Sequence, residues 1–202
     1  DSEQPGLADP LKPVNKVIFV FNDKLYLYGL KPVSQVYVKT VPQPMRTGID
    51  NFFYNLRFPI RFVNSLLQGK LKKAGQETTS FALNSVLGFA GFLKPSREVS
   101  WLSPEPSKED TGQTLGVWGF GPGFYIVWPI IGPSSLRGTA GKVGDFFLDP
   151  VTYIERPLAL AIGVDAAEKI NALSLRLGEY EDLKEAALDP YAAFREGYYQ
   201  YR

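Results

Sequence analysis

The carboxylates and lysines are the side chains that could carry out covalent chemistry, because the 202 residues include neither histidine nor cysteine. This absence excludes Ser-His-Asp and Cys-His nucleophiles, the usual zinc sites, haem ligation by histidine and disulfides. Glu105, Glu109 and Asp110 lie close together and could act as paired carboxylates, for instance in glycan cleavage. They stand in a segment rich in proline and serine, with no apolar surroundings to raise a carboxyl pKa. The sequence therefore favours a protein that is not an enzyme, with no cofactor and no metal site.

The overall composition indicates one domain, residues 1–202, without a strong global charge. The 22 basic residues nearly balance the 21 acidic ones, so nucleic acid is not an expected partner. No stretch of eighteen apolar residues runs without a break, and no simple membrane-spanning helix is expected. Since the chain begins at Asp1, without an initiator methionine or signal sequence, we expect a mature or trimmed form. Residues 1–8 are expected to be a flexible linker.

The segment from Thr114 to Gly138 is apolar and also rich in glycine and proline, and Arg137 is its one charged residue. Burying each large apolar side chain releases roughly 1.5–3 kcal/mol, so the segment must be covered. Its glycines and prolines exclude a long regular helix. It could be a loop in a soluble core, or irregular backbone enclosed by protein within a membrane. If it folds back at Pro122-Gly123, helical arms of about ten residues would reach ~15 Å, which suits a single membrane leaflet.

Amphipathic helices are the elements that must position these residues. The first is predicted to begin at Asp9-Pro10 and to end at Gly29, with a wide apolar face and a narrow polar sector opposite. The apolar face contains Val14, Ile18, Phe21, Leu25 and Tyr28, and the polar sector contains Lys12, Asn15, Lys16, Asn22 and Asp23. Such a helix is either nearly engulfed by protein or lies in a lipid interface.

The later segments continue the helical pattern. Helices are predicted from the prolines after Val41, from Pro59 to Gly69, and over 70–87, followed by an exposed polar loop over 96–113. An apolar segment, 151–164, precedes a C-terminal part, 165–202, with a long charged helix and a short aromatic one that Asp189-Pro190 caps. Since no convincing strand alternation or internal repeat is present, the predicted fold class is all-α.

Several long motifs are similar to one known family. They are DPLKPVNKVIFVFND from Asp9, VPQPMRTGIDNFFYNLRFPIRFVNSLLQGK from Val41, FALNSVLGFAGF from Phe81, DTGQTLGVWGFGPGFYIVWPIIGPSSLRG from Asp110 and DFFLDP from Asp145. In this order they resemble the MlaA (VacJ) family, lipid-transport lipoproteins of the Gram-negative outer membrane. The family's lipidated N-terminal cysteine is absent from this chain. Lys12, Lys16, Phe124 and Gly138 also differ from residues common in that family.

The resemblance implies a ring-like assembly of amphipathic helices in the inner, periplasmic leaflet of the outer membrane, around a central amphipathic channel and with a Gly/Pro-rich hairpin. It implies transport of mislocalised phospholipids from the outer leaflet to a soluble periplasmic carrier of the MlaC type, which maintains lipid asymmetry. It also implies contact with a trimeric porin, and lipid anchoring through the N-terminal cysteine. No covalent chemistry is implied. The direction of transport, the porin and the head-group preference are left open.

Three groups of residues are the candidate functional sites. Because a head group needs a polar track and acyl chains an apolar one, we expect a polar channel lining. It would comprise Asn51, Asn55, Lys73, Glu77, Ser80 and Asn84. A gate with glycine hinges would comprise Trp118, Gly121, Gly123, Phe124, Tyr125 and Trp128. A membrane interface would comprise Lys12, Lys16, Phe52, Phe53 and Arg137.

Each of these groups also has an ordinary structural interpretation. The polar lining could equally be solvated faces or hydrogen-bonded core residues, and Lys12 and Lys16 could lie on a solvated helix face. Arg137 could anchor a loop at a head group or cap a following helix. The alternative function is a structural, porin-binding lipoprotein without transport activity. Phospholipid bound to the purified protein would distinguish transport from this alternative.

Overall fold

The computed structural model describes residues 8–102, 109–154 and 157–201. Its elements are α1 (Lys12–Leu25), η1 (Tyr26–Leu30), α2 (Lys31–Thr40), α3 (Gln43–Leu56), α4 (Phe58–Leu67), α5 (Leu71–Val86), η2 (Pro95–Glu98), α6 (Thr111–Val117), β1 (Tyr125–Trp128), β2 (Gly132–Ser135), α7 (Leu136–Leu148), η3 (Pro150–Tyr153), α8 (Leu158–Ser174), α9 (Glu179–Ala186) and α10 (Pro190–Tyr201). The all-α fold class is thus confirmed, with one short β-hairpin added.

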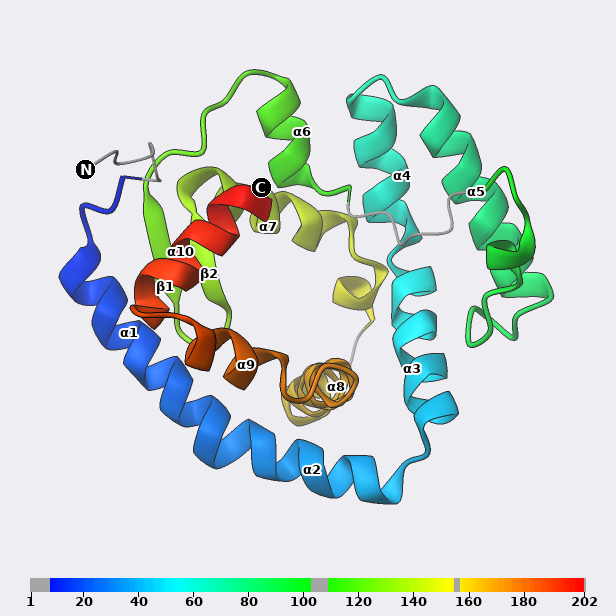
Figure 1. Cartoon of the computed structure of the whole chain (residues 1–202). Coiled ribbons are helices and arrows are strands. Elements are labelled where there is room, and N and C mark those ends of the chain that lie inside the picture. Colours follow the sequence, from blue (N-terminus) through cyan, green and yellow to red (C-terminus); the bar gives the residue numbers. More distant parts are fainter. Residues whose placement is uncertain (1–7, 103–108, 155–156, 202) are drawn as a thin grey trace.

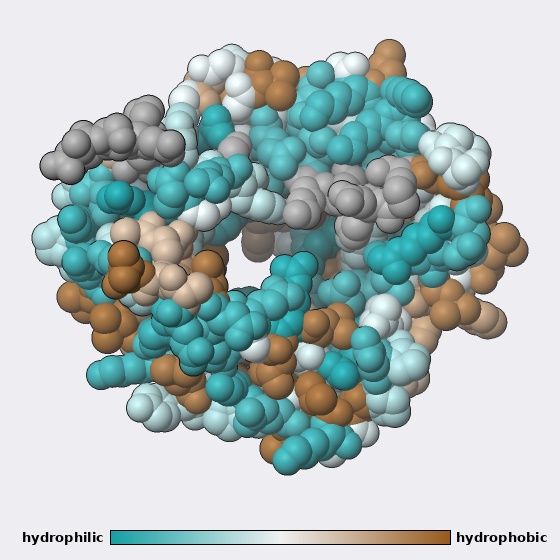
Figure 2. Space-filling view, in the orientation of Figure 1, coloured by the Kyte–Doolittle hydropathy of each residue, from teal (hydrophilic) through white to brown (hydrophobic). Residues whose placement is uncertain are grey.

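The elements are arranged as a ring (Figure 1). The segment α1–α2 forms one long arc, α3 continues around the circumference, and α8, α9 and α10 return along the inner side. In the same orientation, Figure 2 shows an opening that passes through the middle of the molecule. The ring is therefore hollow when side chains are included, and residues on its inner side face a shared space.

The first helix does not end at Gly29, so that prediction is wrong. A π-helical turn, η1, joins α1 to α2, and the helix continues to Thr40. The Lys31 N–H donates to the carbonyl of Tyr26, five residues earlier. This wider turn lets Pro32 enter at the start of α2, because a local change of hydrogen-bond register avoids the clash that proline causes in a regular helix. The continuous arc follows from that turn.

The hairpin is made of strands and not of helical arms. Tyr125–Trp128 pairs antiparallel with Gly132–Ser135, and Ile130 at the turn has a φ of 67°. Tyr125 and Val127 are buried while Trp128 is exposed, which is the alternation expected of a strand. Four residues are too few for this alternation to be recognised in the sequence. The expectation of no strands is therefore wrong for this segment.

The burial pattern is the reverse of that in a water-soluble protein. Among the described residues, the buried side chains comprise 7 apolar and 17 polar or charged ones, whereas 37 large apolar side chains are exposed. The apolar cluster of Tyr125, Val127 and Tyr191, with Ile18, Phe19 and Tyr198 against it, lies where the hairpin packs on α1 and α10. Because water disfavours so much exposed apolar surface, the outside of the ring is suited to an apolar solvent.

The remaining predicted segments agree with the structure in part. The helices α3, α4 and α5 lie where the proline and glycine signals placed them, and Gly69, with a φ of 72°, follows the end of α4. The charged C-terminal helix is divided by Gly178 into α8 and α9. Within the predicted exposed loop over 96–113, Ser96, Leu102 and Glu109 are buried. Residues 1–7 of the predicted linker and Glu105 lie outside the described residues.

Candidate functional site

A cavity of about 430 Å³, which we call the inner cavity, is formed by elements that are far apart in the sequence. It is lined from α3 and α4 on one side, from η2 on another, and from α8 and the end of α10 on the third. The charged members of its lining are Asp50, Arg57, Arg61, Lys94, Arg97, Glu109, Glu168 and Arg176. Five basic and three acidic side chains therefore face this space.

Helical spacing explains why α3 and α4 present charges to this cavity. Asp50, Tyr54, Arg57 and Arg61 follow one another at intervals of four, three and four residues, which places them on one face. These four residues were not predicted to line a channel, although their spacing is visible in the sequence. The predicted lining took Asn51 and Asn55 from the same region instead.

Two of the arginines in this lining are held by carboxylates. Arg61 donates to Glu77 at 2.8 Å, and both side chains are buried. Arg57 donates from Nε to Asp149 Oδ2 at 2.9 Å, and its two terminal nitrogens bond to both carboxylate oxygens of Glu168. Burial alone would lower the pKa of the Arg57 guanidinium, but the bonds to Glu168 and Asp149 raise it above its usual value.

Lys94 has an unusual environment in the same cavity. Its Nζ lies 3.9 Å from the centroid of the Tyr54 ring, and the guanidinium of Arg61 lies 3.7 Å from that same ring. Burial and the nearby charge of Arg97 lower the pKa of Lys94 to about 8. Lys94, Arg97 and Arg176 form no ion pair with any described residue. Within the part of the chain that the structure describes, the lining thus includes positive charges that no carboxylate pairs with.

Two further cavities adjoin this one through shared residues. A cavity of about 580 Å³ shares Arg57 and Glu168 with it, and adds Phe146, Val151, Ile154 and Ala161 as apolar lining. A cavity of about 500 Å³ at the beginning of α3 shares Lys94 and Arg97. The three spaces therefore lie in series along α3, with charged side chains at both junctions. Such a series can accept a long amphipathic molecule.

The predicted polar lining is mostly engaged in bonds within the protein. Asn51 lines the third cavity and donates to the carbonyl of Phe92 at 3.2 Å. Asn55 donates to Ser85 Oγ and to the Ala90 carbonyl, and Asn84 Oδ1 accepts from the Ser96 N–H at 3.1 Å. These amides hold the turn after α5 against α3. Asn55 and Asn84 are buried, Ser80 is half-buried, and Glu77 pairs with Arg61 as described.

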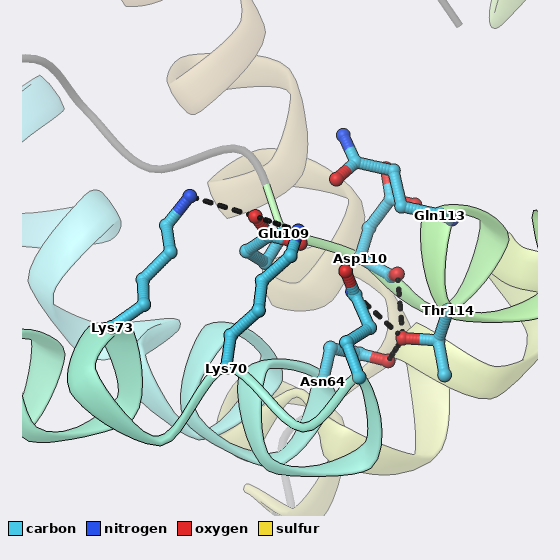
Figure 3. A network of polar contacts seen from close by, with 8 residues as sticks. Asn64, Lys70, Lys73, Glu109, Asp110, Gln113 and Thr114 are labelled. Carbon is cyan, nitrogen blue, oxygen red and sulfur yellow. Dashed lines mark hydrogen bonds and ion pairs between the residues drawn. The ribbon is translucent and has the colours of Figure 1, made fainter. Parts of the chain in front are cut away.

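Lys73, the remaining member, belongs to a network around Glu109 (Figure 3). Lys73 and Lys70 bond to Glu109 Oε1 at 2.7 and 2.9 Å. Burial alone would raise the pKa of Glu109, but the hydrogen bonds from the two lysines lower it below its ordinary value. Asp110 caps α6 by accepting from the Gln113 N–H at 2.8 Å. Glu109 and Asp110, two of the three carboxylates considered for acid–base chemistry, therefore have structural roles.

The β-hairpin is fastened to α1 by two asparagines spaced seven residues apart. Asn15 donates to the Tyr125 carbonyl at 3.1 Å and accepts from the Val127 N–H at 2.9 Å. Asn22 donates to the Trp128 carbonyl at 2.9 Å and accepts from the Ile130 N–H at 2.7 Å. Asn15 and Asn22 of the polar sector thus face the hairpin, whereas Val14, Phe21 and Tyr28 of the apolar face are exposed.

The predicted gate residues are not gathered into one group. Tyr125 is fully buried among Tyr191 and Tyr198, whereas Trp118 and Trp128 are exposed. Trp118 Nε1 donates to the Leu67 carbonyl at 3.1 Å, and Trp128 Nε1 donates to Thr139 Oγ1 at 2.9 Å.

The remaining three gate positions precede the hairpin. Gly121 is exposed and Phe124 is half-buried. A Cβ at Gly123, which has a φ of 71°, would lie 2.7 Å from the Leu136 side chain. That position therefore requires glycine for both its backbone and its close packing.

The predicted interface residues lie in different places. Lys12 and Lys16 are exposed on α1, and Lys16 Nζ lies 5.6 Å from the centroid of the Tyr191 ring. Phe52 is exposed and Phe53, which lines the inner cavity, is half-buried. Arg137 donates to the Phe120 carbonyl at 2.9 Å and so ties the segment before the hairpin to α7.

The lengths and compositions of the described helices bear on whether they could span a membrane. None of them combines the length and the apolar character that crossing a bilayer requires. The described residues contain no group of three or more histidine, cysteine or acidic side chains that could bind a metal ion.

Comparison with known proteins gives consistent matches. Residues 7–202 match the family model described as MlaA lipoprotein. The chain is 32% identical over 200 residues to the intermembrane phospholipid transport system lipoprotein MlaA of Escherichia coli (strain K12), covering 98% of this chain and 78% of that protein. It is 33% identical over 196 residues to the protein of the same name in Haemophilus influenzae (strain ATCC 51907 / DSM 11121 / KW20 / Rd), covering 95% and 76%. A chain solved in work on the structural basis for maintenance of bacterial outer membrane lipid asymmetry superposes with a TM-score of 0.77 at 31% identity, covering 96% of both chains.

Proposed function

Because the chain belongs to the MlaA lipoprotein family, we propose that it is the channel component of a phospholipid transport system. In this function it removes mislocalised phospholipids from the outer leaflet and so maintains the lipid asymmetry of the outer membrane. The observation that carries the proposal is the combination of a hollow ring, unneutralised cations inside it, and an apolar outside. The head group enters the charged inner cavity, and lipid tails surround the ring.

The reversed burial pattern supports a position within one leaflet. The exposed apolar side chains of α1 include Val14, Val17, Val20 and Phe21. Their burial in hydrocarbon is favourable by roughly 25 cal/mol per Å² of apolar surface. A ring without a spanning helix gains this energy when its elements lie along the membrane and its inner side stays polar.

The second cavity supports a route for the acyl chains. Phe146, Val151, Ile154 and Ala161 form the apolar part of its lining, beside Asp149, Thr152, Asp165 and Lys169, while Arg57 and Glu168 connect it to the charged cavity. A phospholipid has the same division, because its phosphate is anionic and its tails are apolar. We assign the head group to the first cavity and the tails to the second.

The partners follow from the same proposal. The apolar outside can contact a trimeric porin as well as lipid, and the end of the route away from the membrane passes lipid to a soluble periplasmic carrier of the MlaC type. A lipid anchor upstream of the described residues holds the ring at the outer membrane. The transport step itself moves a lipid without changing its covalent structure.

Bound lipid provides the first test. The protein is purified in detergent, its lipids are extracted, and they are identified by mass spectrometry. Intact phospholipid is expected without hydrolysed product. Hydrolysed lipid would indicate an enzyme, and a complete absence of lipid would favour the purely structural lipoprotein.

Blocking the second cavity provides the test of the route. Ala161→Trp fills this cavity from α8, so transfer of a fluorescent phospholipid between vesicles is expected to fall at least severalfold. The matched control is Ala166→Trp, because Ala166 is exposed on the same helix and lines none of the three cavities. If Ala161→Trp transfers lipid as fast as the control, the route does not pass through this cavity.

A further inference from the structure

The acidic side chains of the inner cavity are largely neutralised by neighbours. Glu168 is paired with Arg57, and Glu109 is paired with Lys70 and Lys73. Arg61, a cation of the lining, is paired with Glu77. These groups contribute little net field, because each charge has an opposite charge within hydrogen-bond distance. The electrostatic character of the cavity therefore depends on the side chains that remain.

Those remaining side chains are predominantly positive. Lys94 and Arg97 come from the segment after α5, and Arg176 comes from the turn after α8. None of them forms an ion pair with a described residue. Asp50 is the acidic side chain of the lining that forms no ion pair with a described residue, and it is exposed. Among the described residues of the lining, a ligand thus meets three unpaired positive charges and one unpaired negative charge.

We propose that this cavity selects phospholipids by net charge, and that it prefers a head group with a net negative charge, such as that of phosphatidylglycerol, to the zwitterionic head group of phosphatidylethanolamine. The inference rests on the proposed function, because it names the class of lipid that the ring transports. Both lipids carry a phosphate that Lys94, Arg97 and Arg176 can bind. The two lipids differ in the group attached to the phosphate.

That difference matters because of where the positive charges lie. The ammonium of phosphatidylethanolamine would stand within a few ångströms of the same three cations and would find Asp50 as its acidic partner. The glycerol group of phosphatidylglycerol carries no charge and can accept hydrogen bonds from the two arginines. Like charges at short distance in a partly desolvated cavity repel strongly enough to change a binding ratio on the order of fivefold.

The experiment compares the two lipids directly. Detergent-purified protein is mixed with equal amounts of phosphatidylglycerol and phosphatidylethanolamine with identical acyl chains, and retained lipids are quantified by mass spectrometry after gel filtration. For the unmodified chain we expect a phosphatidylglycerol excess on the order of fivefold. For the triple variant Lys94→Gln, Arg97→Gln, Arg176→Gln we expect a ratio close to one with similar total lipid. These three side chains lack ion-pair partners among the described residues, so their removal leaves the pairs that hold the ring.

The control is a second triple variant, Lys24→Gln, Lys39→Gln, Lys72→Gln. It removes the same net charge from three exposed lysines that line none of the three cavities, and it is expected to retain the preference. Equal retention of both lipids by the unmodified chain would overturn the inference while leaving the proposed function in place. Retention of neither lipid would overturn both.

A free phosphate ion is also an anion that the same cations can bind, so its contribution is measured separately. Inorganic phosphate is added in large molar excess to the same mixture. The preference is expected to persist, because the lipid is also held by its tails in the second cavity. If phosphate abolishes the preference without reducing total lipid, the site is a phosphate site and the assignment to lipid head groups is overturned.

Discussion

Lys94 is a residue whose charge the fold disfavours. Burial and Arg97 lower its pKa from 10.5 to about 8, an effect that Arg61 adds to, while Asp50 and Glu77 oppose it. Between pH 8 and 10.5 the folded protein therefore binds fewer protons than the unfolded chain, so stability increases as pH increases through this range. Below pH 8 the penalty for a charged Lys94 is fully present. A side chain retained at such a cost is a candidate for ligand binding.

The first prediction follows from this penalty. Lys94→Met removes the charge and keeps the apolar stem, so the melting temperature in detergent is expected to be about 2–4 °C higher at pH 7, given a gain of roughly 1 kcal/mol. At pH 10.5 the variant and the unmodified chain are expected to melt together. Lys72→Met, at an exposed lysine of α5, is the control and should change neither value. An equal shift at both pH values would contradict the explanation.

The two asparagines of α1 lead to a second prediction. Asn15 is 1% exposed and bonds to Asp9, Tyr125 and Val127, so Asn15→Leu leaves buried polar groups without partners. We expect this substitution to lower the free energy of unfolding by about 2–3 kcal/mol. Asn22→Leu removes equivalent bonds in a solvent-exposed place and should cost less than about 1 kcal/mol. Denaturant titration in detergent measures both values, and similar losses would show that burial is not the deciding factor.

At the scale of elements, the movement proposed for the β-hairpin can be tested. The hypothesis that it gates the channel requires the Asn22 bonds at its tip to open. Asn22→Cys with Ile130→Cys places two thiols at this contact, and the natural chain has no cysteine to compete with them. A short bis-maleimide linker is expected to reduce lipid transfer between vesicles severalfold, because the tip can no longer separate from α1.

The control for this experiment is each single-cysteine variant treated with the same reagent, which cannot be bridged within one molecule. These single variants should transfer lipid like the unmodified chain. Normal transfer by the bridged protein would eliminate the gate hypothesis and leave the hairpin as a static part of the ring.

The helices could be predicted to different extents from the sequence. The helices α3, α4 and α5 were predictable because proline begins the first two and Gly69 separates the second from the third. The continuation of the first helix past Gly29 was not predictable, because a π-helical turn arises from local packing that has no signature in residue order. The two strands were missed since four residues show too little alternation.

The candidate site was harder to predict than the helices. Periodicity divides α3 into an apolar and a polar face, but it does not show whether water, lipid or a cavity meets each face. Asn51, Asn55 and Asn84 were therefore expected to line a channel, whereas their amides mostly fasten the turn after α5. Lys94 and Arg176 are 82 positions apart, and only the closed ring brings them to the same space.

At the scale of the whole molecule, the apolar outside leads to a prediction about membrane association. Val17 and Phe21 are 71% and 51% exposed on α1. Replacing both with Asp is expected to weaken binding to phospholipid vesicles by at least tenfold, because each substitution removes roughly 1–2 kcal/mol of favourable transfer. Vesicle flotation measures the bound fraction, and circular dichroism in detergent should show unchanged helix content.

The control changes the net charge by the same amount at a polar position. Lys72→Glu alters the charge by two units on an exposed part of α5 and should leave flotation nearly unchanged. If the control detaches from vesicles as readily as the double Asp variant, electrostatics and not apolar contact governs the association.

The polar interior of the ring has a consequence for which mutations the protein can accept. In a water-soluble protein the core accepts exchanges among apolar residues, and the surface accepts nearly any polar residue. Here most of the buried positions that the structure describes are occupied by Asn, Ser, Thr, Arg and Glu, whose hydrogen bonds depend on the position of individual atoms. Even a swap to a side chain of similar branching, such as Asn64→Leu, would break bonds to the Ile60 carbonyl and to Thr114. A complete substitution scan is therefore expected to show that the buried polar positions inside the ring tolerate few other residues. The exposed apolar positions on its outside are expected to accept Val, Leu, Ile or Phe interchangeably.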